Sequence, residues 1–302
     1  MTRFYSHGKL LLSGEYLILD GAVGLALPTI HGQDLVVVEN QSEMLRWVSV
    51  DELDKIWFSA DFDLDSFDLI SVTGEKSVGV QLQKILRTAR IMNSRFLVAG
   101  QGYEVRTALE FSRDWGLGSS STLINNIARW ADRNPFELLS NSFGGSGYDI
   151  ACANSEKPLF YRLEGNKPKA LQIDFEPPFA NNLFFIHLNR KQTSSDSIET
   201  YNEVKDIDDQ TIDHISAIGK ELSRCSNLLD FQLLIKEHER IIGKAIGELP
   251  IQESIFSDFK GQIKSLGAWG GDFILAASKD NPTEYFNKKG YSTVISYSDL
   301  IL

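Results

Sequence analysis

The chain has 302 residues, 42% hydrophobic and 24% charged, so it can bury a large core and is expected to fold into two lobes. Its formal net charge of −11 argues against nucleic acid and anionic membrane surfaces as partners, but it still allows an anionic small substrate. Cys152 and Cys225 lack metal-ligand spacing, and no signal peptide or long apolar run is visible, so we expect a cytoplasmic protein.

The first half of the chain is predicted to be rich in strands, which are expected over residues 4–12, 16–19, 34–39, 45–50, 56–58 and 103–109. Apolar residues at helical spacing predict a helix over residues 80–91. The same spacing predicts a helix over residues 123–131, with Asn125 and Asn126 on its polar face. A short helix is expected over residues 135–140.

In the second half, strands and helices alternate. Strands are expected over residues 159–163, 171–175, 183–188, 273–276 and within 293–302, and helices over residues 212–222 and 231–246. Pro177-Pro178 is the best candidate boundary, because two prolines interrupt both helix and sheet. The expected fold class is therefore α+β in two lobes, covering residues 1–176 and 177–302.

A glycine- and serine-rich stretch stands directly before the predicted helix at 123–131. It reads Asp114-Trp115-Gly116-Leu117-Gly118-Ser119-Ser120-Ser121-Thr122. Glycine lets backbone N–H groups approach a ligand, and serine hydroxyls can cap a helix or reach a metal. The start of a helix also binds anions through its free N–H groups and its dipole. The stretch therefore predicts a phosphate site, although an ordinary serine-capped helix would look the same.

Two further glycine-rich stretches flank this one, and a carboxylate lies between them. The stretches are Gly8-Lys9 followed by Gly14-Glu15-Tyr16, and residues 264–272. Lys9 is either a solvent-facing strand residue or a cation aimed at a transferring phosphate. Asp149, in Gly147-Tyr148-Asp149, is either a turn residue or the group that orients and deprotonates an acceptor hydroxyl.

Taken in order, the three glycine-rich stretches resemble the three signature motifs of the GHMP kinases, a family that includes galactokinase, homoserine kinase, mevalonate kinase and phosphomevalonate kinase. The likeness covers nearly the whole chain. It implies the two-lobe α+β GHMP kinase fold, with an N-terminal lobe like domain 2 of ribosomal protein S5 and a ferredoxin-like C-terminal lobe. It also implies a kinase that uses ATP, Mg²⁺ and a small-molecule acceptor, as a monomer or homodimer.

The resemblance also implies roles for individual residues, with Lys9 and Asp149 as the catalytic pair. The nucleotide would be bound by Gly116, Leu117, Gly118, Ser119, Ser120, Ser121, Gly267, Ala268 and Gly270. Ser120 and Glu137 would bind Mg²⁺, although a solvated helix glutamate is an equal reading of Glu137. Glu15, Tyr16, Arg190 and Lys191 are the candidate acceptor contacts, and the last two would also fit a solvated basic pair ahead of a polar loop.

Within the family, two details of the sequence resemble the phosphomevalonate kinases, and one segment resembles the mevalonate kinases as closely. Gly270-Gly271-Asp272 resembles the third motif of the phosphomevalonate branch, whereas Ser146-Gly147-Tyr148-Asp149 is as close to mevalonate kinase. The segment Gly-Tyr-Asp-Ile-Ala, residues 147–151, resembles a bacterial subgroup. Asp114, Leu266 and Trp269 depart from the motifs, so a catalytically inactive binding or regulatory protein is one alternative. A sugar or heptose kinase is another.

Overall fold

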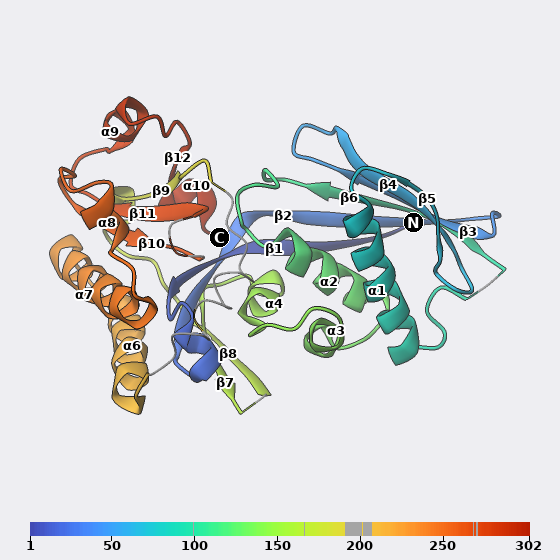
Figure 1. The fold of residues 1–302 in the computed structure, drawn as a ribbon, viewed down its shortest axis with the longest axis horizontal. Coiled ribbons are helices and arrows are strands. Elements are labelled where there is room, and N and C mark those ends of the chain that lie inside the picture. The colour runs from blue at the N-terminus through green and yellow to red at the C-terminus, as the bar shows by residue number, and fades with distance from the viewer. Residues whose placement is uncertain (99, 166, 191–200, 202–206, 268, 270) are drawn as a thin grey trace. The chain divides into compact units, whose positions relative to one another are not determined.

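The structure is a computed structural model that describes residues 1–302 except 99, 166, 191–200, 202–206, 268 and 270 (Figure 1). Its contacts divide the chain into two compact units. Unit 1 comprises Met1–Gly8, His31–Arg113 and Leu117–Asn154, and unit 2 comprises Lys9–Ile30, Asp114–Gly116 and Ser155–Leu302. This division differs from a single cut after residue 176, because strand β7 (Leu159–Glu164) pairs with the start of β2 (Gly24–Asn40) inside unit 2.

Unit 1 is built on a mixed sheet covered by helices. Its strands run in the order β5-β4-β3-β6-β2, and only β3 and β6 are parallel. Besides β2, these strands are β3 (Met44–Val50), β4 (Ile56–Asp63), β5 (Leu69–Thr73) and β6 (Gly102–Leu109). Strand β1 (Thr2–Ser13) pairs with β2. The helices are α1 (Lys76–Met92), α2 (Ser119–Trp130), α3 (Pro135–Ser142) and α4 (Tyr148–Ala153).

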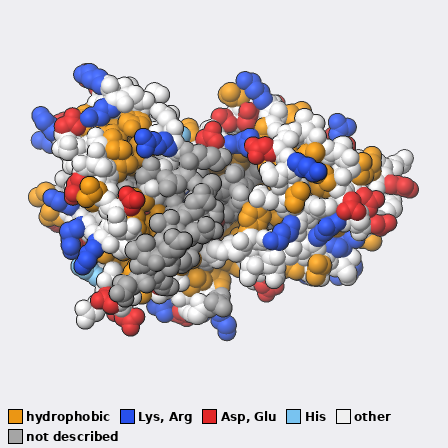
Figure 2. Space-filling view, viewed as in Figure 1, with side chains coloured by type: hydrophobic (Ala, Val, Ile, Leu, Met, Phe, Trp, Pro, Cys, Tyr) orange, Lys and Arg blue, Asp and Glu red, His pale blue; other side chains and the backbone are white. Residues whose placement is uncertain are grey.

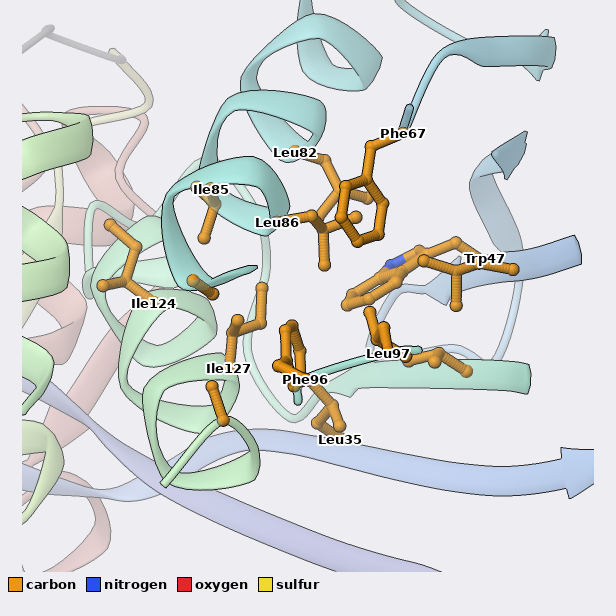
Figure 3. Close-up of a cluster of buried hydrophobic side chains, with 14 of the residues drawn as sticks. Leu35, Trp47, Phe67, Leu82, Ile85, Leu86, Phe96, Leu97, Ile124 and Ile127 are labelled. Carbon is orange, nitrogen blue, oxygen red and sulfur yellow. The ribbon is translucent and has the colours of Figure 1, made fainter. Parts of the chain in front are cut away.

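The core of unit 1 lies between these helices and the sheet. Figure 3 shows Leu82 and Leu86 of α1 and Ile127 of α2 directed toward Trp47 on β3 and Leu35 on β2, and all five are at most 2% exposed. Burying each such side chain contributes about 1.5–3 kcal/mol. The apolar spacing that predicted both helices is therefore the spacing of residues that form this core.

Unit 2 holds a four-stranded antiparallel sheet in the order β10-β11-β9-β12. Its strands are β9 (Leu183–His187), β10 (Gln262–Ser265), β11 (Phe273–Ala277) and β12 (Val294–Ser296). Its helices are α6 (Asp209–Leu222), α7 (Leu228–Ile246), α8 (Ile251–Ser254), α9 (Thr283–Lys288) and α10 (Tyr297–Leu300), with 3-10 turns η1 (Leu17–Asp20) and η2 (Ala180–Asn182). The hairpin of β7 and β8 (Lys167–Gln172) extends from β2.

The expected α+β class is confirmed, and several local predictions are corrected. The strand predicted over residues 16–19 is the 3-10 turn η1, because Gly14 and Tyr16 have φ angles of 93° and 62° that turn the chain away from extended structure. Residues 297–300 form helix α10, which Ser296 caps by accepting from the N–H of Asp299 at 3.2 Å. Helices α4, α8 and α9 and strand β10 had no predicted counterpart.

Figure 2 shows charged side chains of both signs interspersed on the drawn face. Exposed ion pairs such as Arg87–Asp68 and Lys288–Glu284 contribute little each, because water screens them. Within the described residues, every helix is too short or too polar to span a membrane.

Candidate active site

The glycine-serine stretch forms the start of helix α2 in unit 1. Gly118 stands directly before the helix with φ 89°, in the left-handed region that favours glycine, and fully buried Leu117 anchors the turn. The first intrahelical donor is the N–H of Thr122, which bonds to Gly118 O at 3.0 Å. The N–H groups of Ser119, Ser120 and Ser121 thus precede the helical ladder. This is the arrangement that binds anions at helix starts.

Asp149 lies in the first turn of α4, directly after Gly147, whose φ of 82° starts that helix. Its carboxylate is half-buried, and Ser121 Oγ of helix α2 donates a hydrogen bond to its Oδ2. Its other oxygen, Oδ1, lies 3.1 Å from the N–H of Ile150. Within unit 1, Ser121 therefore links Asp149, the candidate base, to the first turn of α2, the candidate phosphate site.

A buried polar network holds α2 against β1 and β2. Asn125 and Asn126 are both 0% exposed, which corrects their assignment to a solvent-facing side of the helix. Asn126 Nδ2 donates to Gln33 O at 2.9 Å, and its Oδ1 accepts from Ser6 Oγ at 2.7 Å. Thr122 Oγ1 donates to Gln33 Oε1 at 2.7 Å. Since an unpaired buried amide costs about 1–3 kcal/mol, these partners explain how polar residues occupy the helix's inner face.

The three glycine-rich stretches meet inside unit 2, at Gly116. Lys9 Nζ, from β1, donates a hydrogen bond to Gly116 O at 2.8 Å. The carboxylate of Asp272, from the third stretch, lies so close to Gly116 that a Cβ there would overlap it. The backbone N–H of Asp272 donates to Arg190 O at 2.9 Å. The lysine of the first motif and the aspartate of the third therefore pack around one glycine of the second.

A buried ionic cluster in unit 2 joins Glu15 of the first motif and Lys264 of the third to His238 and Glu239 of α7. All four side chains are at most 1% exposed. Lys264 Nζ lies 2.5 Å from Glu15 Oε1 and 3.7 Å from Glu239 Oε1. Ser265 Oγ donates to Glu239 Oε2 at 3.0 Å, and His238 Nε2 lies 3.2 Å from Glu15 Oε2. Glu15 is thus enclosed by these partners, and its contact with an acceptor stays a prediction.

Burial shifts the protonation of this buried ionic cluster. Burial raises the pKa of Glu239 to about 7, although the Lys264 ammonium opposes the shift. Burial and the Lys264 charge hold the pKa of His238 well below its usual range, and His238 Nε2 accepts from the N–H of Gly14 at 3.1 Å, so the ring is neutral. Burial also raises the pKa of Glu15, against the opposing charge of Lys264. One ammonium therefore faces two carboxylates, and burial raises the pKa of both.

Tyr16 links the first motif to the third within unit 2. Its hydroxyl oxygen accepts from the backbone N–H of Trp269 at 2.9 Å. Its ring stacks on Tyr201 at a centroid distance of 5.4 Å and an interplanar angle of 25°. Tyr201 in turn donates to Asp20 Oδ2 at 2.5 Å. These contacts hold the turn after β1, which has a positive φ at Tyr16, against the third glycine-rich stretch.

No family model matches the chain, and no curated protein matches it in sequence. Solved structures match it over nearly its full length. The mevalonate kinase of Methanococcus jannaschii is 16% identical with a TM-score of 0.68, covering 95% of this chain and 94% of that chain. The Streptococcus pneumoniae phosphomevalonate kinase in complex with phosphomevalonate and AMPPNP is 16% identical with a TM-score of 0.68, covering 100% and 98%. The Lactococcus lactis galactokinase complexed with galactose is 14% identical with a TM-score of 0.63, covering 95% and 87%.

The chain has the GHMP kinase fold. The likeness to these structures confirms at the level of the fold the resemblance carried by the three glycine-rich motifs. Activity and acceptor are a separate question, because identities of 14–16% are shared by kinases with different acceptors.

The other predicted site residues of this GHMP kinase fold are scattered. Glu137 is exposed in the first turn of α3, and Arg190 is exposed after β9. Gly267 is half-buried with φ 65°. Three predicted residues lie outside the described part of the chain, namely Lys191, Ala268 and Gly270. Within the described part, no group of three or more His, Cys, Asp or Glu side chains could hold a metal ion.

The buried ionic cluster was missed from the sequence although a signal for it exists. Helix α7 places Phe231, Ile235, Ile242 and Ile246 at helical spacing, and all four are buried. Glu239 follows Ile235 by four residues, so the same spacing puts it on the buried face. A carboxylate at such a position needs polar partners or a raised pKa, and Lys264, the first residue of the third glycine-rich stretch, lies 3.7 Å from Glu239 Oε1.

Proposed function

We propose that this protein is an ATP-dependent small-molecule kinase that transfers the γ-phosphoryl group to a hydroxyl or phosphate group of a small acid. One observation carries the proposal: the first turn of α2 presents free N–H groups, and Ser121 of the same turn donates to Asp149. Phosphoryl transfer needs a phosphate cradle close to a group that orients the acceptor, and this turn combines them.

Mevalonate and phosphomevalonate are the acceptors we favour. The motif resemblance points to these two branches, and structural neighbours include kinases named for both. Glu15, Tyr16, Arg190 and Lys191 remain the candidate acceptor contacts. A sugar acceptor is the second candidate, supported by a galactokinase among the neighbours.

The nucleotide phosphates would lie on the backbone N–H groups of residues 116–121, with the hydroxyls of Ser119 and Ser120. Ser120 and Glu137 are exposed, and their side-chain oxygens suit Mg²⁺, which takes hard oxygen ligands and commonly one or two from the protein. Bound there, Mg²⁺ would neutralise charge on the phosphates. The third glycine-rich stretch, through Gly267, Ala268 and Gly270, would complete the nucleotide site.

In the proposed reaction, an oxygen of the acceptor bonds to the γ-phosphorus while the bond from that phosphorus to the bridging oxygen of ADP breaks. With a hydroxyl acceptor, the proton passes to the carboxylate of Asp149 and then to solvent. Lys9, whose ammonium already contacts Gly116 O of the phosphate loop, would stabilise the charge that develops on the phosphoryl oxygens. Lys9 and Asp149 belong to different units, and their joint action is part of the proposal.

Measurement of ADP release with a panel of acceptors tests the proposal. The panel contains mevalonate, phosphomevalonate, homoserine and galactose, each with Mg²⁺ and with a chelator. We expect Mg²⁺-dependent ADP release with one acceptor, and its loss in Asp149→Asn. ATP binding without ADP release for any acceptor would instead favour a catalytically inactive protein. The departures from the family motifs at Asp114, Leu266 and Trp269 support that alternative. No ATP binding by calorimetry would overturn the proposal altogether.

A further inference from the structure

We propose that Ser121 is a positioning residue for Asp149 and not a ligand of the nucleotide phosphates. Its hydroxyl fixes the orientation of the candidate base relative to the turn of α2 that binds phosphate. This inference rests on the proposed kinase function, which assigns the base to Asp149 and the phosphates to that turn. It separates Ser121 from Ser119 and Ser120, with which the sequence had grouped it.

The hydrogen-bonding capacity of a serine supports the separation. A hydroxyl carries one proton, and that of Ser121 is donated to Asp149 Oδ2, so no donor remains for a phosphate oxygen. Ser121 is also 5% exposed, whereas Ser119 is half-buried and Ser120 is exposed. The first two serines of the run can therefore meet a ligand with their hydroxyls, and the third is directed inward to α4.

Two hydrogen bonds orient the carboxylate of Asp149 and leave it accessible to an acceptor hydroxyl. Ser121 holds Oδ2, and the N–H of Ile150 lies 3.1 Å from Oδ1. An ionised carboxylate accepts about four hydrogen bonds, so lone pairs remain for the acceptor hydroxyl. The two contacts therefore fix the plane of the carboxylate while leaving it able to accept a proton.

A second polar link one turn later keeps α4 in register with α2. Asn125 Nδ2 donates to Asn154 Oδ1 at 3.1 Å, and Asn154 Nδ2 donates back to Asn125 Oδ1 at 2.8 Å. Ile124 and Ile150, both fully buried, belong to the hydrophobic core between these links. Helix α4 is thus bonded to α2 at both of its ends. The position of Asp149 is therefore set by contacts with α2.

Steady-state kinetics with the acceptor that supports ADP release test the role. Ser121→Ala should lower kcat by about 10- to 100-fold, the size expected for a lost hydrogen bond to a charged group, with the KM for ATP nearly unchanged. Ser121→Thr retains the hydroxyl and should restore most of kcat. Ser142→Ala is the matched control, because Ser142 is an equally buried helical serine whose hydroxyl bonds to backbone of its own helix. In the Asp149→Asn background, Ser121→Ala should have no further effect on kcat.

Two measurements decide the question without turnover, so they separate this inference from the kinase function itself. By calorimetry, Ser121→Ala should bind ATP as wild type does, whereas Ser120→Ala should bind it more weakly. In urea unfolding, Ser121→Ala and Asp149→Asn together should lower the midpoint by less than the sum of their single effects. Weakened ATP binding with kcat preserved in Ser121→Ala, or additive effects in both cycles, would overturn the inference.

Discussion

The hydroxyl oxygen of Tyr16 accepts a hydrogen bond from the backbone N–H of Trp269 at 2.9 Å, joining residues 253 positions apart in the sequence. Trp269 stands where the third motif of the GHMP kinases has glycine, and Tyr16 belongs to the first motif. The side chain of Trp269 also lies near Gly243 of α7, where an added Cβ would be 3.6 Å from the indole ring. The departure at Trp269 is therefore accommodated by contacts within unit 2.

Tyr16→Phe should weaken nucleotide binding through this contact. The substitution leaves the buried N–H of Trp269 without its hydroxyl partner, at a cost of about 1–3 kcal/mol, while the stack on Tyr201 is kept. We expect a several-fold higher Kd for ATP by calorimetry. Tyr201→Phe is the control, since it loses only the bond to Asp20. Equal ATP affinities for both variants and wild type would show that Tyr16 does not support the third glycine-rich stretch.

Gly116→Ala should lower stability and ATP affinity more than an alanine at another glycine with a similar φ angle. Gly116 has φ 63°, and a Cβ there would overlap the carboxylate of Asp272. Gly165 has φ 61°, and a Cβ added to it would meet no atom within 4 Å, so Gly165→Ala carries the backbone strain alone.

Urea unfolding and ATP calorimetry separate these two terms. We expect Gly165→Ala to lose about 1 kcal/mol of stability and to bind ATP normally. Gly116→Ala should lose more stability and most of its ATP affinity. The same loss at both glycines would mean that the Asp272 contact is without consequence.

Much of the fold could be predicted from the sequence because its elements are regular and amphipathic. The spacing of Leu82, Ile85, Leu86 and Ala89 predicts α1, and these residues form the core of unit 1. The motif order likewise predicts the fold that the solved structures share. The periodicity is local and the motif order can be read along the chain, so a single sequence is enough to detect both.

The network beneath α2 could not be predicted in the same way. Periodicity assigns Asn125 and Asn126 to the polar side of the helix, yet both are buried. Their partners Ser6 and Gln33 lie 119 and 93 residues away in the sequence, so only the tertiary structure reveals that the amides are satisfied. The same holds for the Ser121–Asp149 bond, which depends on how α4 packs against α2.

Glu239→Gln should change how stability depends on pH. The pKa of Glu239 is raised to about 7 in the folded protein from an ordinary 4.5, so the folded state binds the proton more tightly than the unfolded state. Its contribution to stability is therefore fully present below pH 4.5 and is lost as pH rises to about 7. Glutamine mimics the protonated form at every pH.

The variant should match wild type in urea unfolding at low pH and exceed it by about 1–3 kcal/mol at pH 8. Glu237→Gln is the control on the same helix, because Glu237 is partly exposed and pairs with Arg240. A constant difference between Glu239→Gln and wild type at all pH values would contradict a proton held by Glu239.

In the proposed reaction, substitutions of Asp149 and Lys9 should have the largest effects on catalysis. If Asp149 accepts the acceptor's proton and Lys9 stabilises the shifting charge, both act mainly in the transition state, so their loss lowers kcat more than substrate affinity. Asp149→Asn keeps the shape and removes the charge, and it should lower kcat by about 10²–10⁴-fold with ATP affinity near wild type. Lys9→Met should also lower kcat strongly.

The double variant distinguishes a working pair from two independent contributions. Because one group receives the proton while the other stabilises charge in the same step, the combined loss should be less than the product of the single losses. Rapid-quench measurement of phosphoryl transfer with saturating ATP and acceptor gives the rate of that step directly. Nearly full turnover in Asp149→Asn would make Asp149 a residue that only starts helix α4, and the proposed mechanism would then be wrong.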